Sequence, residues 1–135
     1  MESFNCIIVL NKERDRVLFC KRMNDPYKGL YNFVGGKLEE GEDSLHAAYR
    51  ELYEETGISK NDITLYPFMD YIWHFQQIRM EVYVGVLKKE VELRSEKHPL
   101  YWLDMSHDFF DMNVFAGEGN IGHMIEILKM TKIPE

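Results

Sequence analysis

The chain has 135 residues, of which 45% are hydrophobic and 29% are charged. This balance is typical of a folded globular protein and excludes an intrinsically disordered chain, and the length predicts a single domain over residues 1–135. Asp and Glu (23) outnumber Lys and Arg (16), which gives a formal net charge of −7. That charge argues against a general binder of nucleic-acid backbone, so we expect no nucleic-acid polymer as a partner.

The cysteine pattern and the hydropathy pattern indicate the cellular setting. Cys6 and Cys20 lie in separate apolar runs without a CxxC spacing, which predicts buried thiols and neither a disulfide framework nor a zinc site. The first residues do not resemble a signal peptide. No apolar run approaches the roughly 18 residues of a membrane span. We therefore expect a cytoplasmic protein without membrane contact.

The first third of the chain is rich in strand signals. Residues 4–10 are apolar and partly β-branched, and residues 16–22 resume that pattern after a polar turn, which predicts a β-hairpin. Residues 23–30 contain proline and glycine and are expected to form a loop. Residues 31–34 are expected to be extended and to run directly into Gly35-Gly36.

The clearest helix is predicted over residues 43–56. Asp43 or Ser44 provides a side chain that caps its start, and Gly57 is the residue type that ends a helix. Apolar and small residues recur at helical spacing and predict one packing face. These residues are Leu45, Ala48, Tyr49, Leu52 and Thr56.

The remaining elements alternate between strands and one more helix. Residues 63–75 and 78–87 are predicted to be two strands, and residues 99–103 a short one. Residues 120–130 are predicted to be a helix with an apolar side. Mixed strands and helices without repeats indicate an α/β or α+β class, with helices packed on a mixed sheet.

Three glutamates on the predicted helix 43–56 are the first chemical signal. Glu51, Glu54 and Glu55 are spaced i, i+3, i+4, which places them within one arc of roughly 100°, away from the apolar stripe. A solvated acidic helix face is one interpretation, although like charges at these spacings repel. The other interpretation is a metal site, because Gly35-Gly36 precedes the helix and Arg50 can orient the carboxylates. Hard divalent cations select such clusters of carboxylate and carbonyl oxygens.

Residues 36–58 also resemble a known family. They fit the Nudix box, G-x5-E-x7-R-E-U-x-E-E-x-G-U, in which U is a bulky apolar residue. Every defined position is filled, and nine defined positions at fixed spacing are far more specific than a short glycine pattern. The positions are Gly36, Glu42, Arg50, Glu51, Leu52, Glu54, Glu55, Gly57 and Ile58.

The resemblance implies a fold and a reaction. Members of the Nudix family form an α/β/α sandwich around a mixed sheet, and they hydrolyse a diphosphate linked to another group, usually a nucleoside. The expected cofactor is Mg²⁺, with Mn²⁺ as the alternative. By resemblance, the metal ligands are Glu51, Glu54, Glu55 and a backbone carbonyl of Gly35 or Gly36. Arg50 would orient the carboxylates, Glu42 would support the loop, and Lys37 would approach the phosphates.

The general base remains open at the level of the sequence. In the family it is either a glutamate of the box or a carboxylate on a later loop. Glu96 occupies the region of that later loop, although it is equally interpretable as an exposed loop carboxylate. The expected catalytic residues are therefore Arg50, Glu51, Glu54 and Glu96.

The expected substrate contacts are Arg22, Asn32, Lys37 and Asn120. Many members have proline where this chain has Val34, and the stretch 32–36 resembles the MutT-like branch that cleans the nucleotide pool, in which an asparagine bonds the base. Asn120 follows a segment resembling the loop that closes over a purine, and it is also a natural helix N-cap. The five histidines form no metal-spaced pair, so none is assigned a catalytic role.

The sequence therefore predicts a metal-dependent pyrophosphohydrolase of a nucleoside triphosphate, with an oxidised purine such as 8-oxo-dGTP as a candidate. Other nucleoside diphosphate derivatives remain alternatives, namely ADP-ribose, dinucleoside polyphosphates and RNA 5′ ends. A non-catalytic module that senses a nucleotide is a further alternative. The expected partner is a small nucleotide, and the chain is expected to be a monomer or a homodimer.

Overall fold

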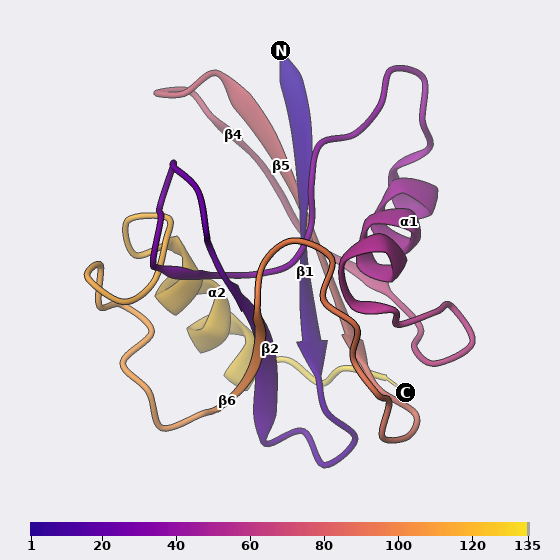
Figure 1. The fold of residues 1–135 in the computed structure, drawn as a ribbon. Coiled ribbons are helices and arrows are strands. Elements are labelled where there is room, and N and C mark those ends of the chain that lie inside the picture. The colour runs from indigo at the N-terminus through magenta and orange to yellow at the C-terminus, as the bar shows by residue number, and fades with distance from the viewer. Residues whose placement is uncertain (135) are drawn as a thin grey trace.

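The computed structural model describes residues 1–134 and contains six strands and two helices (Figure 1). In chain order the elements are β1 (Glu2–Leu10), β2 (Arg16–Lys21), β3 (Tyr31–Asn32), α1 (Ser44–Thr56), β4 (Tyr66–Trp73), β5 (Ile78–Val86), β6 (Leu100–Asp104) and α2 (Asn120–Lys129).

All six strands belong to one mixed sheet. Its order is β3-β2-β1-β5-β4, and β6 pairs with β2 beside this path. Strands β1 and β5 run parallel from Glu2↔Ile78 to Leu10↔Val86, whereas the other named pairs are antiparallel. The mixed sheet predicted from the sequence is confirmed.

Strands β1 and β2 meet only where the hairpin turns, and then they separate. Their one registered pair is Leu10↔Val17. Along the rest of β1, backbone hydrogen bonds of 2.8–2.9 Å join residues 3–7 to residues 34–38. The segment that contains Gly35-Gly36 therefore takes the place of a neighbouring strand. This pairing fixes the glycine turn beside α1.

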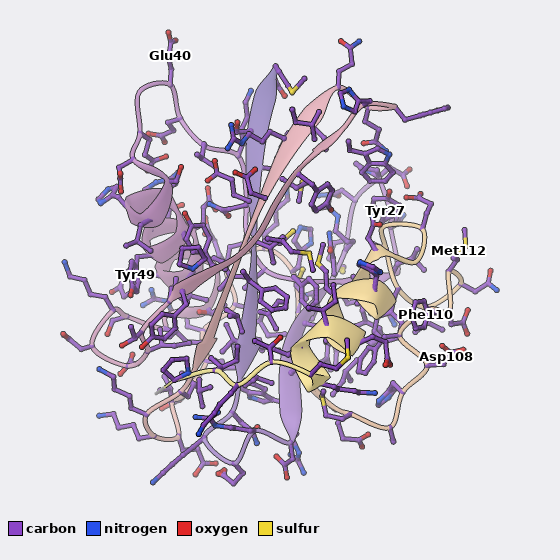
Figure 2. The ribbon with its side chains drawn as sticks, turned by 180° about the vertical axis from the view of Figure 1, so that it is seen from behind. Tyr27, Glu40, Tyr49, Asp108, Phe110 and Met112 are labelled. Carbon is purple, nitrogen blue, oxygen red and sulfur yellow. The ribbon has the colours of Figure 1, made fainter. Side chains whose placement is uncertain are left out.

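Helix α1 covers one face of the sheet and α2 covers the other (Figure 1). Because side chains alternate along a strand, Ile7 and Val9 pack on the side of α1, while Ile8 and Leu10 pack on the side of α2. Figure 2 shows Tyr49 of α1 on one side of the sheet and Phe110 beside α2 on the other. The predicted α/β/α sandwich is confirmed.

The ends of α1 are as predicted, but its packing face is not entirely so. The Asp43 side chain accepts a hydrogen bond from the His46 N–H at 3.1 Å, and Gly57 ends the helix with φ = 80°. Leu52 and Ala48 are fully buried as expected, whereas Leu45 is 41% exposed. Leu45 lies in the first turn of the helix, and Ala47 is buried there instead.

The strand predicted over residues 63–75 is shorter in the structure. Ile63 forms only an isolated bridge with Leu87, and β4 begins three residues later. Phe75 lies in the turn between β4 and β5 and is 95% exposed. Apolar residues therefore extend beyond the paired strand on both sides.

Neither of the two helices within residues 1–134 has the length and apolar character that crossing a membrane requires.

Candidate active site

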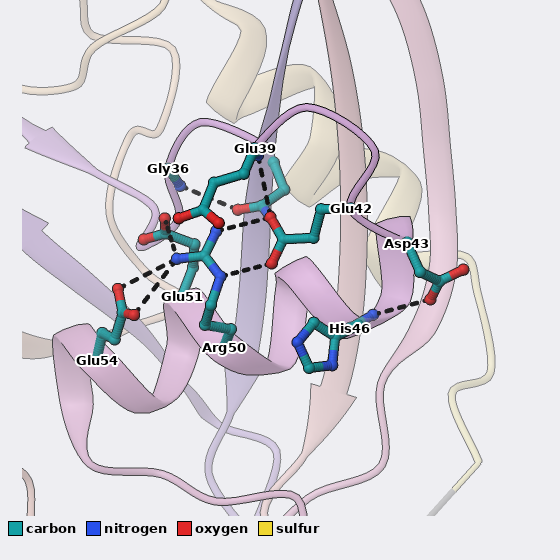
Figure 3. A network of polar contacts seen from close by, with 9 residues as sticks. Gly36, Glu39, Glu42, Asp43, His46, Arg50, Glu51 and Glu54 are labelled. Carbon is teal, nitrogen blue, oxygen red and sulfur yellow. Dashed lines mark hydrogen bonds and ion pairs between the residues drawn. The ribbon is translucent and has the colours of Figure 1, made fainter.

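Arg50 lies at the centre of an acidic network on α1 (Figure 3). Its Nε and Nη2 atoms donate to the two Glu42 carboxylate oxygens at 2.6 and 2.8 Å. Its Nη1 donates to Glu51 at 3.1 Å and, with longer bonds of 3.3–3.4 Å, to Glu54. One guanidinium thus offsets the mutual repulsion of three carboxylates. Orientation of the carboxylates by Arg50 is the role that the sequence predicted.

Glu42 supports the loop that leads into α1. Besides its two bonds with Arg50, it accepts a hydrogen bond from the Glu39 N–H at 3.0 Å, and its side chain is only 8% exposed. The hydrogen bond from Arg50, followed by the one from Glu39, lowers the pKa of Glu42 from 4.5 to about 2. Glu42 is fully engaged in these bonds, which agrees with a supporting role.

Acidification is expected to remove the contribution of Glu42 to stability. The folded-state pKa is depressed, so this contribution is complete above the ordinary value of 4.5 and is lost as the pH falls towards about 2. We expect Glu42→Gln to be less stable than the native chain at about pH 6, and the difference to shrink steadily as the pH falls from 4.5 towards about 2. Urea unfolding at several pH values measures the difference. A gap that does not change with pH contradicts this assignment.

The glycine turn approaches the α1 carboxylates closely. A Cβ atom on Gly36 would lie 2.5 Å from the Glu51 carboxylate, so only glycine fits without displacing it. Burial raises the pKa of Glu51 against the opposing charge of Arg50. This contact places the backbone of the turn next to a partly buried carboxylate.

Asn5 holds this turn, and sequence reasoning missed it. It is 3% exposed; its backbone N–H donates to the Gly36 oxygen at 2.8 Å, and its Oδ1 accepts from the Gly36 N–H at 2.9 Å. One residue thus satisfies both backbone polar groups of Gly36. The signal that could have revealed it is a lone asparagine inside the otherwise apolar stretch 4–10.

Glu55 lies on the opposite side of the acidic face from Glu54 and lines a pocket. Burial raises its pKa to about 7, and the charges of Glu51 and Glu96 add to this effect. A backbone hydrogen bond from Gly35 acts in the opposite direction. Burial thus raises the pKa of both Glu51 and Glu55, although Arg50 bonds the first of them.

The donor chemistry around Gly35-Gly36 fits a hard divalent cation, because the carboxylate of Glu51 lies against the backbone of the turn and Glu55 lines the same pocket. Within residues 1–134, no three Asp, Glu, His or Cys side chains gather closely enough to hold a metal ion. In this conformation Glu51 and Glu54 bond Arg50 instead. A site made of Glu51, Glu54 and Glu55 therefore requires Glu54 to exchange its long bonds with Arg50 for the ion.

The segment between β5 and β6 is fixed at two points on opposite sides of the site. The Arg94 N–H donates to the Thr56 oxygen at 2.8 Å, at the end of α1. Further on, His98 Nδ1 accepts from the Met23 N–H at 3.0 Å, just beyond β2. Figure 1 shows this segment rising beside α1 and arching over to β6. Glu96 lies between the two anchors, and its charge contributes to the raised pKa of Glu55.

A pocket of about 410 Å³ extends from the glycine turn towards α2. It is lined by aromatic and apolar side chains with a few polar groups, the usual composition of a small-molecule site. Six of the residues that the sequence predicts to bind metal or substrate line this pocket. They are Gly35, Gly36, Glu55, Arg22, Asn32 and Asn120. Further lining residues are Phe33, Tyr71, Trp73, Met80 and His98.

The four predicted substrate contacts differ in their surroundings. Arg22 donates from Nε to the Pro26 oxygen at 3.1 Å, and Asn32 Oδ1 accepts from the Phe33 N–H at 2.9 Å, which leaves the Asn32 amide nitrogen for other contacts. Lys37 does not line the pocket; its Nζ pairs with Glu2 at 2.9 Å on an exposed surface.

Asn120 is not the N-cap of α2. Gly119 holds that position with φ = 91°, and no side chain caps the helix. Of the two roles that the sequence left open for Asn120, capping is wrong, because the chain enters α2 in a left-handed conformation that glycine adopts freely. The Asn120 side chain lines the pocket instead.

Comparison with known proteins identifies the family. The NUDIX domain model matches residues 2–111, and the chain belongs to this family of hydrolases. An 8-oxo-dGTP diphosphatase of Buchnera aphidicola is 29% identical over 80 residues, 59% of this chain and 64% of that protein. An RNA pyrophosphohydrolase of Actinobacillus pleuropneumoniae is 30% identical over 131 residues, 97% of this chain and 54% of that protein.

The fold agrees with solved structures. A MutT structure from a study of Aliivibrio salmonicida and Vibrio cholerae superposes with a TM-score of 0.71, covering 96% of this chain and 98% of that one at 21% identity. The chain spans between 23% and 64% of the length of several curated relatives that it matches. Nudix hydrolases generally use divalent metal ions, which agrees with the oxygen-rich donor set described above.

Proposed function

We propose that this chain hydrolyses a nucleoside triphosphate to the monophosphate and pyrophosphate, and that an oxidised purine such as 8-oxo-dGTP is a substrate. The observation that carries the proposal is the composition of the pocket. Glu55 and the glycine turn form one end, and two asparagine side chains, Asn32 and Asn120, belong to the same cavity. Amides both donate and accept hydrogen bonds, as recognition of a purine edge requires.

The phosphate end would hold Mg²⁺, or Mn²⁺, through Glu51, Glu54, Glu55 and a carbonyl of the glycine turn. When bound, such an ion offsets phosphate charge and lowers the pKa of attacking water. In the proposed hydrolysis water attacks a phosphorus atom, the P–O anhydride bond breaks, and a carboxylate takes the proton. Glu96 is our candidate for the carboxylate that takes the proton. Its charge acts on Glu55, and hydrogen bonds on either side hold the segment that carries it.

An RNA 5′ end is the second candidate substrate. The relative that matches 97% of this chain is named an RNA pyrophosphohydrolase. The net charge of −7 is a physical argument against it, since a strand of RNA favours a basic path over the surface.

The test is a substrate panel with Mg²⁺ that contains ordinary and oxidised nucleoside triphosphates, ADP-ribose, a dinucleoside polyphosphate and 5′-triphosphate RNA. Phosphate and pyrophosphate are quantified separately, and a chelator removes the metal in a parallel series. We expect pyrophosphate from a purine triphosphate, at least ten-fold faster than from other compounds and lost on chelation. Preference for RNA or ADP-ribose would contradict the proposed substrate, and absence of turnover would favour a nucleotide-sensing module.

A further inference from the structure

His98 is a buried histidine in the pocket wall for which the proposed hydrolysis has no role. His98 is 7% exposed and lines the pocket, two residues after Glu96 in the chain. Its Nδ1 atom accepts the Met23 N–H at 3.0 Å. Neighbouring backbone is also fixed, because the Lys21 N–H donates to the Pro99 oxygen at 2.9 Å. The ring therefore has a defined position.

The hydrogen bond with Met23 determines which ring nitrogen carries the proton. A backbone N–H can only donate, so Nδ1 must be unprotonated, and the neutral ring then carries its proton on Nε2. Burial, followed by the charges of Arg22 and Lys97, lowers the pKa of His98, which keeps the ring neutral near pH 7. The Nε2 atom of this ring is thus a hydrogen-bond donor and has no lone pair with which to take a proton.

The Nε2 atom has room to use this donor. Within residues 1–134, the His98 ring has one hydrogen bond, at Nδ1, and Nε2 has none. Nε2 is also not one of the unpaired side-chain atoms that are fully buried, so it is not shut off from solvent. The ring borders the pocket. We infer from these facts that the Nε2–H is accessible from the pocket.

His98 belongs to the end of the pocket that contains the glutamates. Arg22, Glu55 and His98 all line the same pocket, and the charge of Arg22 lowers the pKa of both His98 and Glu55. Glu96, two residues before His98, also acts on Glu55. In the proposed function, the phosphates of the substrate lie at this end of the pocket, beside Glu55. Their ionised oxygens accept hydrogen bonds.

We propose that His98 binds the phosphate part of the substrate, with its neutral ring donating Nε2–H to a non-bridging phosphoryl oxygen. The class of ligand rests on the proposed function, whereas the donor and its direction rest on the geometry of the ring. The contact orients the phosphate chain and transfers no proton. His98 therefore adds a second donor to Arg22 in the lining of the pocket.

Two substitutions of His98 distinguish the role of Nδ1 from the role of Nε2. His98→Asn keeps an acceptor near the Nδ1 position for the Met23 N–H but does not reach into the pocket. His98→Gln extends an amide nitrogen towards the Nε2 position and loses the bond to Met23. The probes are inorganic pyrophosphate and guanosine, each titrated calorimetrically in buffer that contains Mg²⁺. Both measurements are independent of turnover.

We expect His98→Asn to bind pyrophosphate about ten-fold more weakly, because it loses one hydrogen bond to a charged group. Guanosine binding should be unchanged, and His98→Gln should retain most of the affinity for pyrophosphate. In the native chain, the nitrogen NMR signals of His98 should show a neutral ring protonated at Nε2. The Nε2–H signal should move when pyrophosphate is added.

Several results would overturn the inference. A ring protonated at Nδ1, or charged at neutral pH, removes the donor geometry. If the native chain and His98→Asn bind pyrophosphate with equal affinity, His98 does not contact the phosphates. If His98→Asn weakens only the binding of guanosine, His98 contacts the base instead. If no nucleotide is hydrolysed but pyrophosphate still shifts the Nε2–H signal, the proposed function fails while this inference stands.

Discussion

Glu54→Gln is expected to lower kcat/KM for the preferred substrate by roughly 10²–10⁴-fold, the range typical of losing a carboxylate that acts in the chemistry. The substitution preserves shape and removes only the charge. Glu54 is half exposed, at 48%, and its bonds to Arg50 are the longest in the network. The free energy of unfolding should therefore change by less than about 1 kcal/mol. Pyrophosphate release measures the first effect and urea unfolding the second.

Glu40→Gln is the matched control. It makes the same change of charge in the same loop and helix region, but Figure 2 shows Glu40 at the tip of the loop before α1, pointing into solvent. Its activity should equal that of the native chain. If Glu54→Gln were as active as Glu40→Gln, Glu54 would have no part in the reaction, and the acidic face of α1 would be a solvated surface.

Gly35→Ala is expected to destabilise the fold by roughly 2–5 kcal/mol, from backbone strain together with overpacking. The glycine has φ = 148°, and a Cβ atom there would lie 2.1 Å from the backbone oxygen of Asn5. That oxygen belongs to β1, so it cannot move without disturbing the sheet. The segment 34–38 must then separate from β1, and hydrolysis should be lost as well. Urea unfolding and thermal melting measure the loss.

Gly41→Ala controls for the left-handed conformation alone. Gly41 has φ = 76°, but no atom lies within 4 Å of a Cβ built on it. Strain without a clash is expected to cost about 1 kcal/mol and to leave activity intact. Equal destabilisation by the two substitutions would show that close packing against Asn5 is unimportant.

The parts of the site that the sequence predicts are local in the chain. Asp43, Gly57 and the spacing of Glu51, Glu54 and Arg50 are set by one helix, and a helix has a fixed geometry that spacing reveals. The exposure of Leu45 is the exception, because the same periodicity does not say where the sheet beneath the helix ends.

The parts that sequence reasoning missed depend on contacts between distant segments. Asn5 and Gly36 meet because β1 and β2 separate, and no local pattern predicts that separation. His98 is positioned by Met23, 75 residues earlier. Lys37 was expected near the phosphates, yet in this structure it bonds Glu2, a residue brought beside it by the pairing of residues 34–38 with β1.

One end of the pocket is built from a single stretch of the chain, and the rest from several separate segments. The acidic end comes from one continuous stretch, residues 35–55, whereas the other walls come from separate segments, including the loop before β3, strands β4 and β5, and the start of α2. Each of those segments can vary in length and side chains while the acidic stretch stays intact. Ligand preference can thus diverge in evolution independently of hydrolytic chemistry, which agrees with the different substrates for which relatives of this chain are named.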